Sequence, residues 1–140
     1  MGSSVLTMEV RVMVVEDHEP FRRFICSALG TQEHLQIIDQ VDDGLEAVLH
    51  ATALKPDLIV LDIGLPGLNG IEVARRVRQL VPEAKIVFLS QESSADVVHE
   101  ALRVGALGYV LKTQAQDELL DAIETVLQGK QFVTSGLDHS

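Results

Sequence analysis

Four apolar runs of the sequence each end in a polar side chain that could take part in chemistry. Glu16 and Asp17 follow the first run, and Asp62 ends the second. Ser90 and Lys112 end the two later runs. Three carboxylates, a hydroxyl and an amine therefore stand at the tips of four strand-like segments. This placement indicates an assembled site rather than core packing alone.

These side chains suit phosphoryl transfer to a carboxylate. Two like charges about 4 Å apart repel by roughly 4 kcal/mol at an effective dielectric near 20, so three clustered acids require a counter-charge. A hard divalent cation with oxygen ligands, Mg²⁺ or Mn²⁺, relieves this repulsion. One carboxylate oxygen can then attack a phosphorus atom. A lysine ammonium and a hydroxyl can hold the remaining phosphoryl oxygens.

The elements that position these side chains alternate between strand and helix. The repeat of roughly 20–25 residues favours a parallel sheet covered by helices on both faces. Ligands bind beyond the carboxyl ends of such strands, so the four tips meet in one pocket if their strands are close neighbours. Strands are expected over 10–15, 35–41, 58–61, 86–89 and 107–111.

Helices are expected between and after these strands, with apolar residues on their inner faces. Asp42 or Asp43 can cap the helix after the second strand. A last amphipathic helix is expected over 118–127, and the chain from Gly129 onward loses periodicity and resembles a tail. The inward residues are expected to be Leu45, Val48 and Leu49 in the helix after the second strand, and Ile71, Ala74, Val77 and Leu80 in the next.

The composition is that of a globular protein. The chain has 140 residues, of which 46% are hydrophobic, enough for one domain with a real core. No run approaches the roughly 18 apolar residues of a membrane helix, and the start does not have the pattern of a signal peptide, so we expect a cytoplasmic protein without membrane contact. The net charge of −10 disfavours direct binding to nucleic acid.

The polar tips and the loop after Asp62 closely resemble the receiver domain of bacterial two-component response regulators. The resemblance implies a flavodoxin-like α/β fold, a doubly wound (βα)5 three-layer sandwich with the parallel strand order 2-1-3-4-5. It covers nearly the whole chain, from about Glu9 to Gly129. The segments that carry it are 14–17, 61–70, 87–90 and 108–112.

The resemblance implies a phosphoacceptor and a metal site. Asp62 corresponds to the aspartate that is phosphorylated by a sensor histidine kinase. Asp17, Asp62 and the backbone carbonyl of Gly64 correspond to direct Mg²⁺ ligands, and Glu16 to a ligand that acts through water. The receiver would promote its own phosphorylation and dephosphorylation without being a conventional turnover enzyme.

The resemblance also implies a switch beside the phosphoacceptor. Lys112 corresponds to the lysine that pairs with the acceptor or its phosphoryl group, Ser90 to the switch hydroxyl, and Tyr109 to the aromatic that turns inward with it. Two residues depart from the family. Gln91 stands where Ala or Gly is frequent, and Thr113 stands where many members have Pro after a cis peptide bond, so both are expected to modulate phosphate lifetime and signal output.

The loop and the end of the sequence resemble the subfamily with a LuxR-type helix-turn-helix output domain. We expect residues 1–8 to be an N-terminal extension, 9–129 the receiver, and 130–140 a linker toward an output domain that is absent from this sequence. The expected function is a phosphorylation-dependent switch that forms homodimers and controls transcription. This domain itself is not expected to contact DNA.

Each of these residues also has an ordinary structural interpretation. Glu16 and Asp17 could cap the following helix, Ser90 could be a turn hydroxyl, Tyr109 a half-buried strand aromatic, and Lys112 a solvated strand end. Their joint occurrence at four strand tips favours the receiver.

Two other functions are weighed against the receiver. An Asp-nucleophile phosphatase usually carries a second acid two residues after the nucleophile, where this sequence has Gly64. A degenerate receiver could act as a docking module without phosphorylation, but the complete set of acids, Ser90 and Lys112 argues against it.

Overall fold

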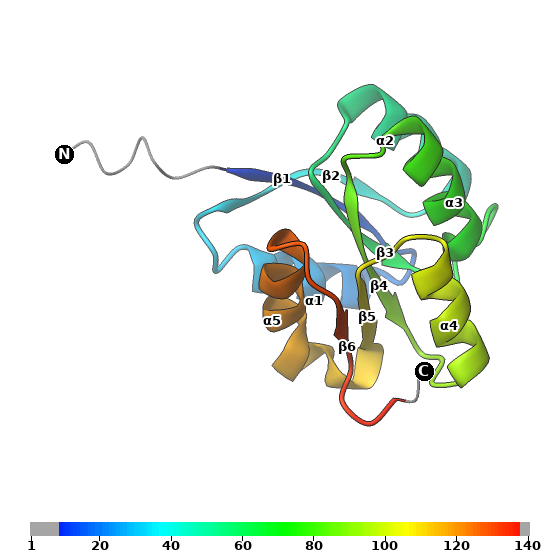
Figure 1. The fold of residues 1–140 in the computed structure, drawn as a ribbon. Helices are drawn as coiled ribbons and strands as arrows, with labels where there is room; N and C mark the ends of the chain where they lie inside the picture. Colours follow the sequence, from blue (N-terminus) through cyan, green and yellow to red (C-terminus); the bar gives the residue numbers. More distant parts are fainter. Residues whose placement is uncertain (1–8, 138–140) are drawn as a thin grey trace.

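The computed structural model describes residues 9–137 as a parallel sheet between two layers of helices (Figure 1). Neighbouring strands in the sheet follow the order β2-β1-β3-β4-β5-β6, and every described pair is parallel. The predicted flavodoxin-like order 2-1-3-4-5 is confirmed, with one strand added at the β5 edge. The strands are β1 (Val10–Val15), β2 (Leu35–Val41), β3 (Leu58–Asp62), β4 (Lys85–Ser90), β5 (Gly108–Leu111) and β6 (Phe132–Val133).

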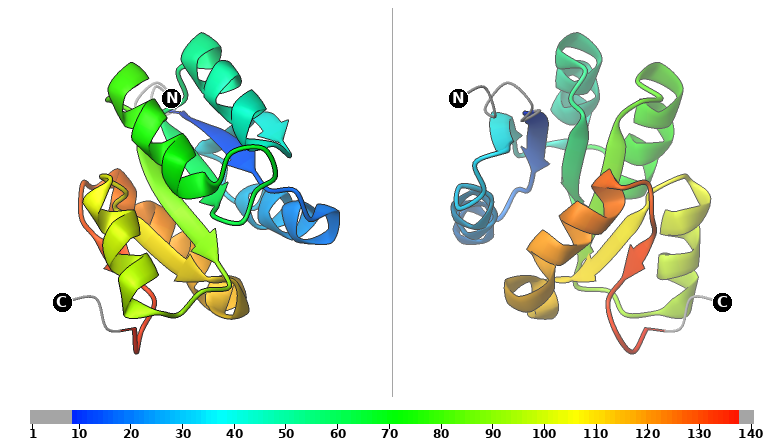
Figure 2. Two further views of the ribbon diagram at one scale, coloured as in Figure 1. Left: turned by 90° about the vertical axis from the view of Figure 1, so that its right-hand side faces the viewer. Right: turned by 60° about the vertical axis from the view of Figure 1, so that its left-hand side comes forward.

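The helices lie on both faces of this sheet (Figures 1 and 2). Helices α1 and α5 cover one face and α2, α3 and α4 the other, so side chains of each strand alternate between two cores. In β1, Val12 and Val14 pack with the α1 and α5 side, whereas Met13 and Val15 pack with the opposite side. The helices are α1 (Glu19–Leu29), α2 (Gly44–Leu54), α3 (Gly70–Leu80), α4 (Ala95–Arg103) and α5 (Ala115–Leu127), preceded by a 3-10 turn, η2 (Lys112–Gln114).

The predicted inner faces of α2 and α3 are partly wrong. Leu45 and Leu49 are 50% and 64% exposed, and Leu80 is 52% exposed. Helix α2 instead packs through small residues, of which Ala47 and Ala51 are fully buried. Small residues bring the helix close to the sheet, and this leaves the larger leucines on the outer surface, which periodicity alone does not reveal.

The last part of the described chain forms a strand that the sequence pattern did not predict. Phe132 and Val133 pair with Gly108 and Tyr109 of β5. Helix α5 also begins at Ala115, earlier than the expected residue 118. The expected extension over residues 1–8 and the end of the expected linker lie outside the described residues. Within 9–137, no helix has both the length and the apolar character of a membrane span.

The turns at the carboxyl ends of the strands are held by caps and by a close backbone approach. Asp43, one of the two predicted caps, accepts hydrogen bonds from the amides of Leu45 and Glu46, at 2.8 and 3.1 Å. Asn69 caps α3. At Gly70, a Cβ atom would lie 2.2 Å from the backbone oxygen of Asp62, so only glycine lets the loop return against the end of β3.

A histidine joins α2 to the edge strand β2. His50 Nδ1 lies 2.5 Å from Asp39 Oδ2, and its Nε2 lies 3.2 Å from Glu46 Oε1. The hydrogen bond to Asp39 raises the pKa of His50 above its ordinary value of 6.5, and the Glu46 carboxylate adds to this effect. The folded protein therefore binds more protons than the unfolded chain between pH 6.5 and the raised folded pKa.

This pKa shift predicts a contribution to stability that is present below pH 6.5 and is lost as the pH rises through the folded pKa. Urea unfolding across this range should show a smaller loss of stability for His50→Gln than for the wild type. His99→Gln is the matched control, because His99 is an exposed histidine of α4. Equal pH dependence in His50→Gln and the wild type would contradict the prediction.

Candidate functional site

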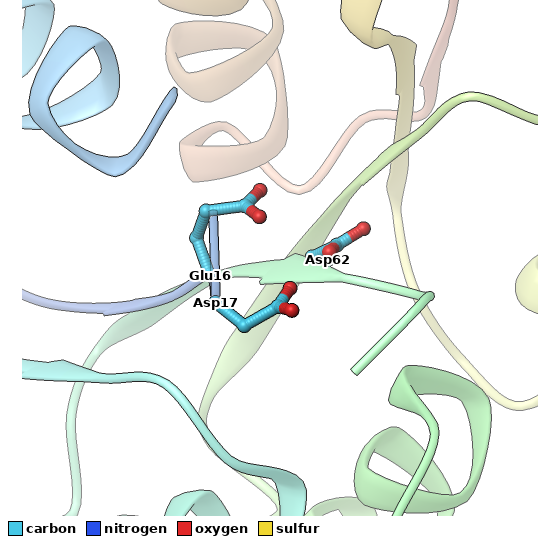
Figure 3. Close-up of side chains that lie close together, drawn as sticks. All are labelled: Glu16, Asp17 and Asp62. Carbon is cyan, nitrogen blue, oxygen red and sulfur yellow. The ribbon is translucent and has the colours of Figure 1, made fainter. Parts of the chain in front are cut away.

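The three predicted acids come together at the carboxyl ends of β1 and β3 (Figure 3). Glu16 and Asp17 follow β1, and Asp62 ends β3, its neighbour in the sheet. One carboxylate oxygen from each lies within 4.8 Å of the others. Glu16 and Asp62 are 0% and 5% exposed, whereas Asp17 is open to solvent. The sequence predicted this convergence on the condition that the strands are close neighbours, and β1 and β3 are neighbours in the sheet.

These acids line a pocket of about 640 Å³. Tyr109 is the one predicted site residue that does not line it, because its side chain is buried beside the pocket. The other predicted residues all do, namely Glu16, Asp17, Asp62, Gly64, Ser90, Gln91, Lys112 and Thr113. Four lining residues were not predicted: His18, Phe21, Ile63 and Glu92.

The Lys112 ammonium lies between the two buried acids. Its Nζ is 2.9 Å from Glu16 Oε1 and 3.4 Å from Asp62 Oδ2. Lys112 Nζ also lies over the Phe21 ring, 4.9 Å from its centroid, a distance at which ring and cation attract each other. One positive charge faces three carboxylates, so the ionised cluster keeps an excess of two negative charges.

Glu16 is the most deeply buried of the three acids. Burial raises the pKa of its carboxyl, and the Asp62 charge adds to this shift. Lys112 and the His18 amide act in the opposite direction, the amide donating to Oε2 at 3.0 Å. Oε1 contacts Lys112 as an ion pair and receives no well-aligned hydrogen bond. A buried carboxylate oxygen with unused acceptor capacity suits a water or metal ligand.

Asp62 is held at both carboxylate oxygens. Oδ1 accepts a hydrogen bond from the Gly64 amide at 3.2 Å, and Oδ2 faces Lys112. Gly64 is exposed at the start of the loop after β3, and no atom lies within 4 Å of where its Cβ would stand. The side chain is therefore oriented by its neighbours while one side of the pocket stays open.

Ser90 and Tyr109 are linked through the loop that follows β4. The Glu92 amide donates to Ser90 Oγ at 2.9 Å, and the Tyr109 hydroxyl donates to the Glu92 backbone oxygen at 2.7 Å. Tyr109 is fully buried, so its side chain already takes the inward position that the resemblance implies for the switch. Burial raises the pKa of Tyr109, and the nearby Ser90 hydroxyl lowers it in part.

The two residues that depart from the family lie at the pocket rim. Gln91 and Thr113 are both exposed. The structure describes no cis peptide bond, so the bond between Lys112 and Thr113 is trans. Their expected effect on phosphate lifetime stays a prediction.

The donor set fits a hard divalent cation. All three side chains offer carboxylate oxygens, the ligand type that Mg²⁺ prefers, and Asp17 leaves the site accessible to a hydrated ion. No cysteine or histidine belongs to this cluster. A softer metal such as zinc would usually take one of those ligands.

Comparison with known proteins agrees with this geometry. Residues 12–124 match the family described as response regulator receiver domain. The chain belongs to this family. It is 33% identical over 126 residues to the transcriptional regulatory protein LiaR of Bacillus subtilis. The aligned residues cover 90% of this chain and 60% of LiaR. Over 140 residues it is 29% identical to DegU of Brevibacillus brevis, covering 100% of this chain and 59% of DegU.

The receiver thus spans about 60% of the length of these relatives. Solved structures agree with the fold and with the LuxR-type resemblance. A LuxR-family response regulator from Aurantimonas sp. SI85-9A1 has a TM-score of 0.86 and 30% identity, with 91% of each chain covered. The receiver domain of a putative NarL from Mycobacterium tuberculosis has a TM-score of 0.82 and 31% identity, covering 88% of this chain and 99% of that one.

The residues missed by sequence reasoning act through backbone or helix position. Phe21 lies in the first turn of α1, and its spacing was interpreted as core packing. Glu92 contributes its main-chain N–H and C=O, which no side-chain pattern reveals. His18 provides an amide to Glu16. For Phe21 and His18, only their spacing from the predicted acids in the sequence could have indicated a place in the site.

Removing one charge from the acidic cluster should stabilise the protein when no metal is present. Asp17→Asn relieves repulsion with Glu16 and Asp62, by about 0.5–1 kcal/mol because Asp17 is exposed and screened. Urea unfolding in EDTA measures this gain. Mg²⁺ should then stabilise the wild type more than the variant, since a ligand of the folded state raises its stability.

Asp42→Asn is the matched control for this experiment, because Asp42 is an exposed acid outside the cluster. It should not reproduce the gain in EDTA or the weaker response to Mg²⁺. Lower stability of Asp17→Asn in EDTA would show that the three acids do not repel one another in the folded protein.

Proposed function

We propose that this receiver accepts a phosphoryl group on Asp62 from a sensor histidine kinase and thereby switches the output of a response regulator. The observation that carries the proposal is the Lys112 ammonium between Glu16 and Asp62 in an open acidic pocket. In this pocket an oriented carboxylate, that of Asp62, lies beside the positive charge of Lys112. A two-component regulator of this type acts in the cytoplasm, where its kinase presents the phosphohistidine.

Asp17, Asp62 and the Gly64 backbone carbonyl would hold Mg²⁺ or Mn²⁺ directly, and Glu16 would hold it through water. When bound, the cation supplies charge neutralisation and polarises phosphoryl oxygens. The excess negative charge of the cluster supports this assignment. Asp17 is the exposed member of the cluster, so a hydrated ion could reach it from solvent.

The transfer forms one bond and breaks another. An Asp62 carboxylate oxygen bonds to phosphorus as the bond between phosphorus and the kinase imidazole nitrogen breaks, and the imidazole leaves with the electron pair. Lys112 then exchanges its contact with Asp62 Oδ2 for phosphoryl oxygens, and the Ser90 hydroxyl donates to another. The new charge and acceptor oxygens bias the loop after Ser90.

The output of the switch rests on the relatives. These relatives are transcriptional regulators. This chain does not cover about 40% of their length. We infer that phosphorylation changes homodimerisation of the receiver and that transcription is controlled through a separate LuxR-type DNA-binding domain. The receiver's own net charge of −10 disfavours direct DNA contact.

Incubation with acetyl phosphate and Mg²⁺ tests the phosphoacceptor. Intact mass should show one phosphoryl adduct on the wild type and none on Asp62→Asn, because the amide removes the nucleophile. Asp42→Asn, which changes an exposed acid outside the pocket, should keep the adduct. EDTA should suppress the adduct in the wild type and in Asp42→Asn.

The alternatives give different results in the same assay. A wild type that forms no adduct under any condition would favour a phosphorylation-independent docking module. Rapid turnover of unrelated phosphoesters would favour an Asp-nucleophile phosphatase.

Lys112→Ala should impair switching more than phosphorylation. Loss of one charge-assisted contact should slow adduct formation by about tenfold or more. Homodimerisation induced by beryllofluoride, a mimic of the phosphoryl group, should be lost, because Lys112 then no longer links the mimic to β5. Size-exclusion chromatography with light scattering measures the dimer, with Lys130→Ala, an exposed lysine after α5, as control. Unchanged dimerisation would show that Lys112 has no switching role.

A further inference from the structure

Phe21 is an apolar residue in the wall of a pocket that is lined mainly by polar and charged residues. The proposed phosphoryl transfer gives it no role. Lys112 Nζ lies over its ring, 4.9 Å from the centroid, and the negative face of a ring attracts an ammonium at this distance. The contacts described for this ammonium are therefore two carboxylates, those of Glu16 and Asp62, and one ring.

The start of α1 holds this ring in place. Arg22 Nη1 donates to the Glu16 backbone oxygen at 2.8 Å, which ties the helix to the residue that carries one of the acids. The Phe24 ring lies beside the Phe21 ring, with 5.4 Å between the centroids. Both rings pack against the core that α1 and α5 share on one face of the sheet (Figures 1 and 2). The ammonium therefore rests on a supported surface.

The ring differs from the two carboxylates because a metal ion does not compete for it. Glu16 and Asp62 are also the residues proposed to hold Mg²⁺, through water or directly. A bound cation offsets their charge and repels the ammonium. The ring is neutral and offers no ligand oxygen, so its attraction for the ammonium remains when the metal is bound. It also remains when the contact with Asp62 is exchanged for phosphoryl oxygens.

We propose that Phe21 is a positioning residue that holds the Lys112 ammonium at the Asp62 site through a cation–π contact and thereby speeds phosphoryl transfer. It rests on the proposed function, in which Lys112 receives the phosphoryl oxygens. A lysine side chain loses conformational freedom when it is fixed. The ring fixes it in advance, so that less freedom is lost when the phosphoryl group arrives. Phe21 itself bonds neither to the phosphoryl group nor to the metal and acts only through Lys112.

Stepwise fluorination of the ring tests this contact with little change in shape. Fluorine withdraws electrons from the ring face and so weakens its attraction for a cation. Placing 4-fluoro-, 3,5-difluoro- and 3,4,5-trifluorophenylalanine at Phe21 should slow adduct formation from acetyl phosphate and Mg²⁺ in that order, by about 3- to 10-fold for the last. Intact mass measures the initial rate. A ring that served only as an apolar wall would show no such trend.

Phe132 is the matched control for the series. It is a partly buried phenylalanine on the same core, and it does not line the pocket. The same three fluorinated residues at Phe132 should leave the rate of adduct formation unchanged.

A double-mutant cycle shows whether Phe21 acts through Lys112. Phe21→Leu keeps an apolar side chain but removes the ring, and it should slow adduct formation by about 3- to 10-fold in the wild type. In Lys112→Ala the same change should slow it by less than about twofold, because no ammonium is left to position. Phe21→Tyr keeps the ring face and should stay within about twofold of the wild type. Circular dichroism and urea unfolding establish that each variant is folded.

NMR gives a readout that needs no phosphorylation. Protons over a ring face are shielded, so the ε-methylene signal of Lys112 should lie upfield in the wild type and move downfield in Phe21→Leu. The signal that is missing from Lys112→Arg identifies it. The upfield position should persist with Mg²⁺ and beryllofluoride, since neither competes for the ring.

The possible results separate this role from the proposed function. A rate that does not respond to fluorination at Phe21, or an equal loss for Phe21→Leu with and without Lys112, would overturn the positioning role while the phosphoacceptor assignment stands. An equal Lys112 signal in the wild type and Phe21→Leu would overturn the contact itself. A wild type that forms no adduct would overturn the proposed function and the positioning role together.

Discussion

The repulsion among three carboxylates at one edge of the sheet is the constraint on which the rest of the structure depends. Glu16 and Asp62 are almost fully buried, and Asp17 lies beside them with its oxygen within 4.8 Å of theirs. One ammonium, that of Lys112, partly offsets them. An arrangement with excess negative charge persists only if the backbone holds it, because side chains on mobile loops would separate. The parallel sheet meets this need by fixing the tips of β1, β3, β4 and β5 side by side.

The loops at this edge are built to keep the tips together. Gly70 lets the chain return against the Asp62 carbonyl, where any side chain would clash, and Asn69 starts α3 immediately before it. On the other side, the Gly64 amide holds one Asp62 oxygen. Burial raises the pKa of Glu16, so the fold gives up some stability to keep an acid in place. That cost is understandable if the acids serve a ligand with high positive charge.

The composition of the pocket could be predicted from the sequence because apolar runs with polar tips are local patterns, whereas the strand order was implied by the resemblance to receiver domains. The buried face of α2 could not be predicted, because Leu45 and Leu49 match a helical stripe as well as Ala47 and Ala51 do. Only the distance between helix and sheet decides which pair is buried. Strand β6 is too short to show alternation, and its pairing depends on the position of β5. Glu92 acts through its main chain, for which any residue type except proline serves.

Strand β6 covers the edge of the sheet that lies next to the pocket residue Lys112. Without it, β5 would be an edge strand with unpaired N–H and C=O groups, which invite pairing with other chains. Two residues and the hydroxyl of Thr134, which accepts from the Leu111 amide, cover this edge. Strands β1 and β3 need no such cover, since they are paired on both sides. The edge next to Lys112 and Tyr109 is therefore covered by the shortest of the described strands.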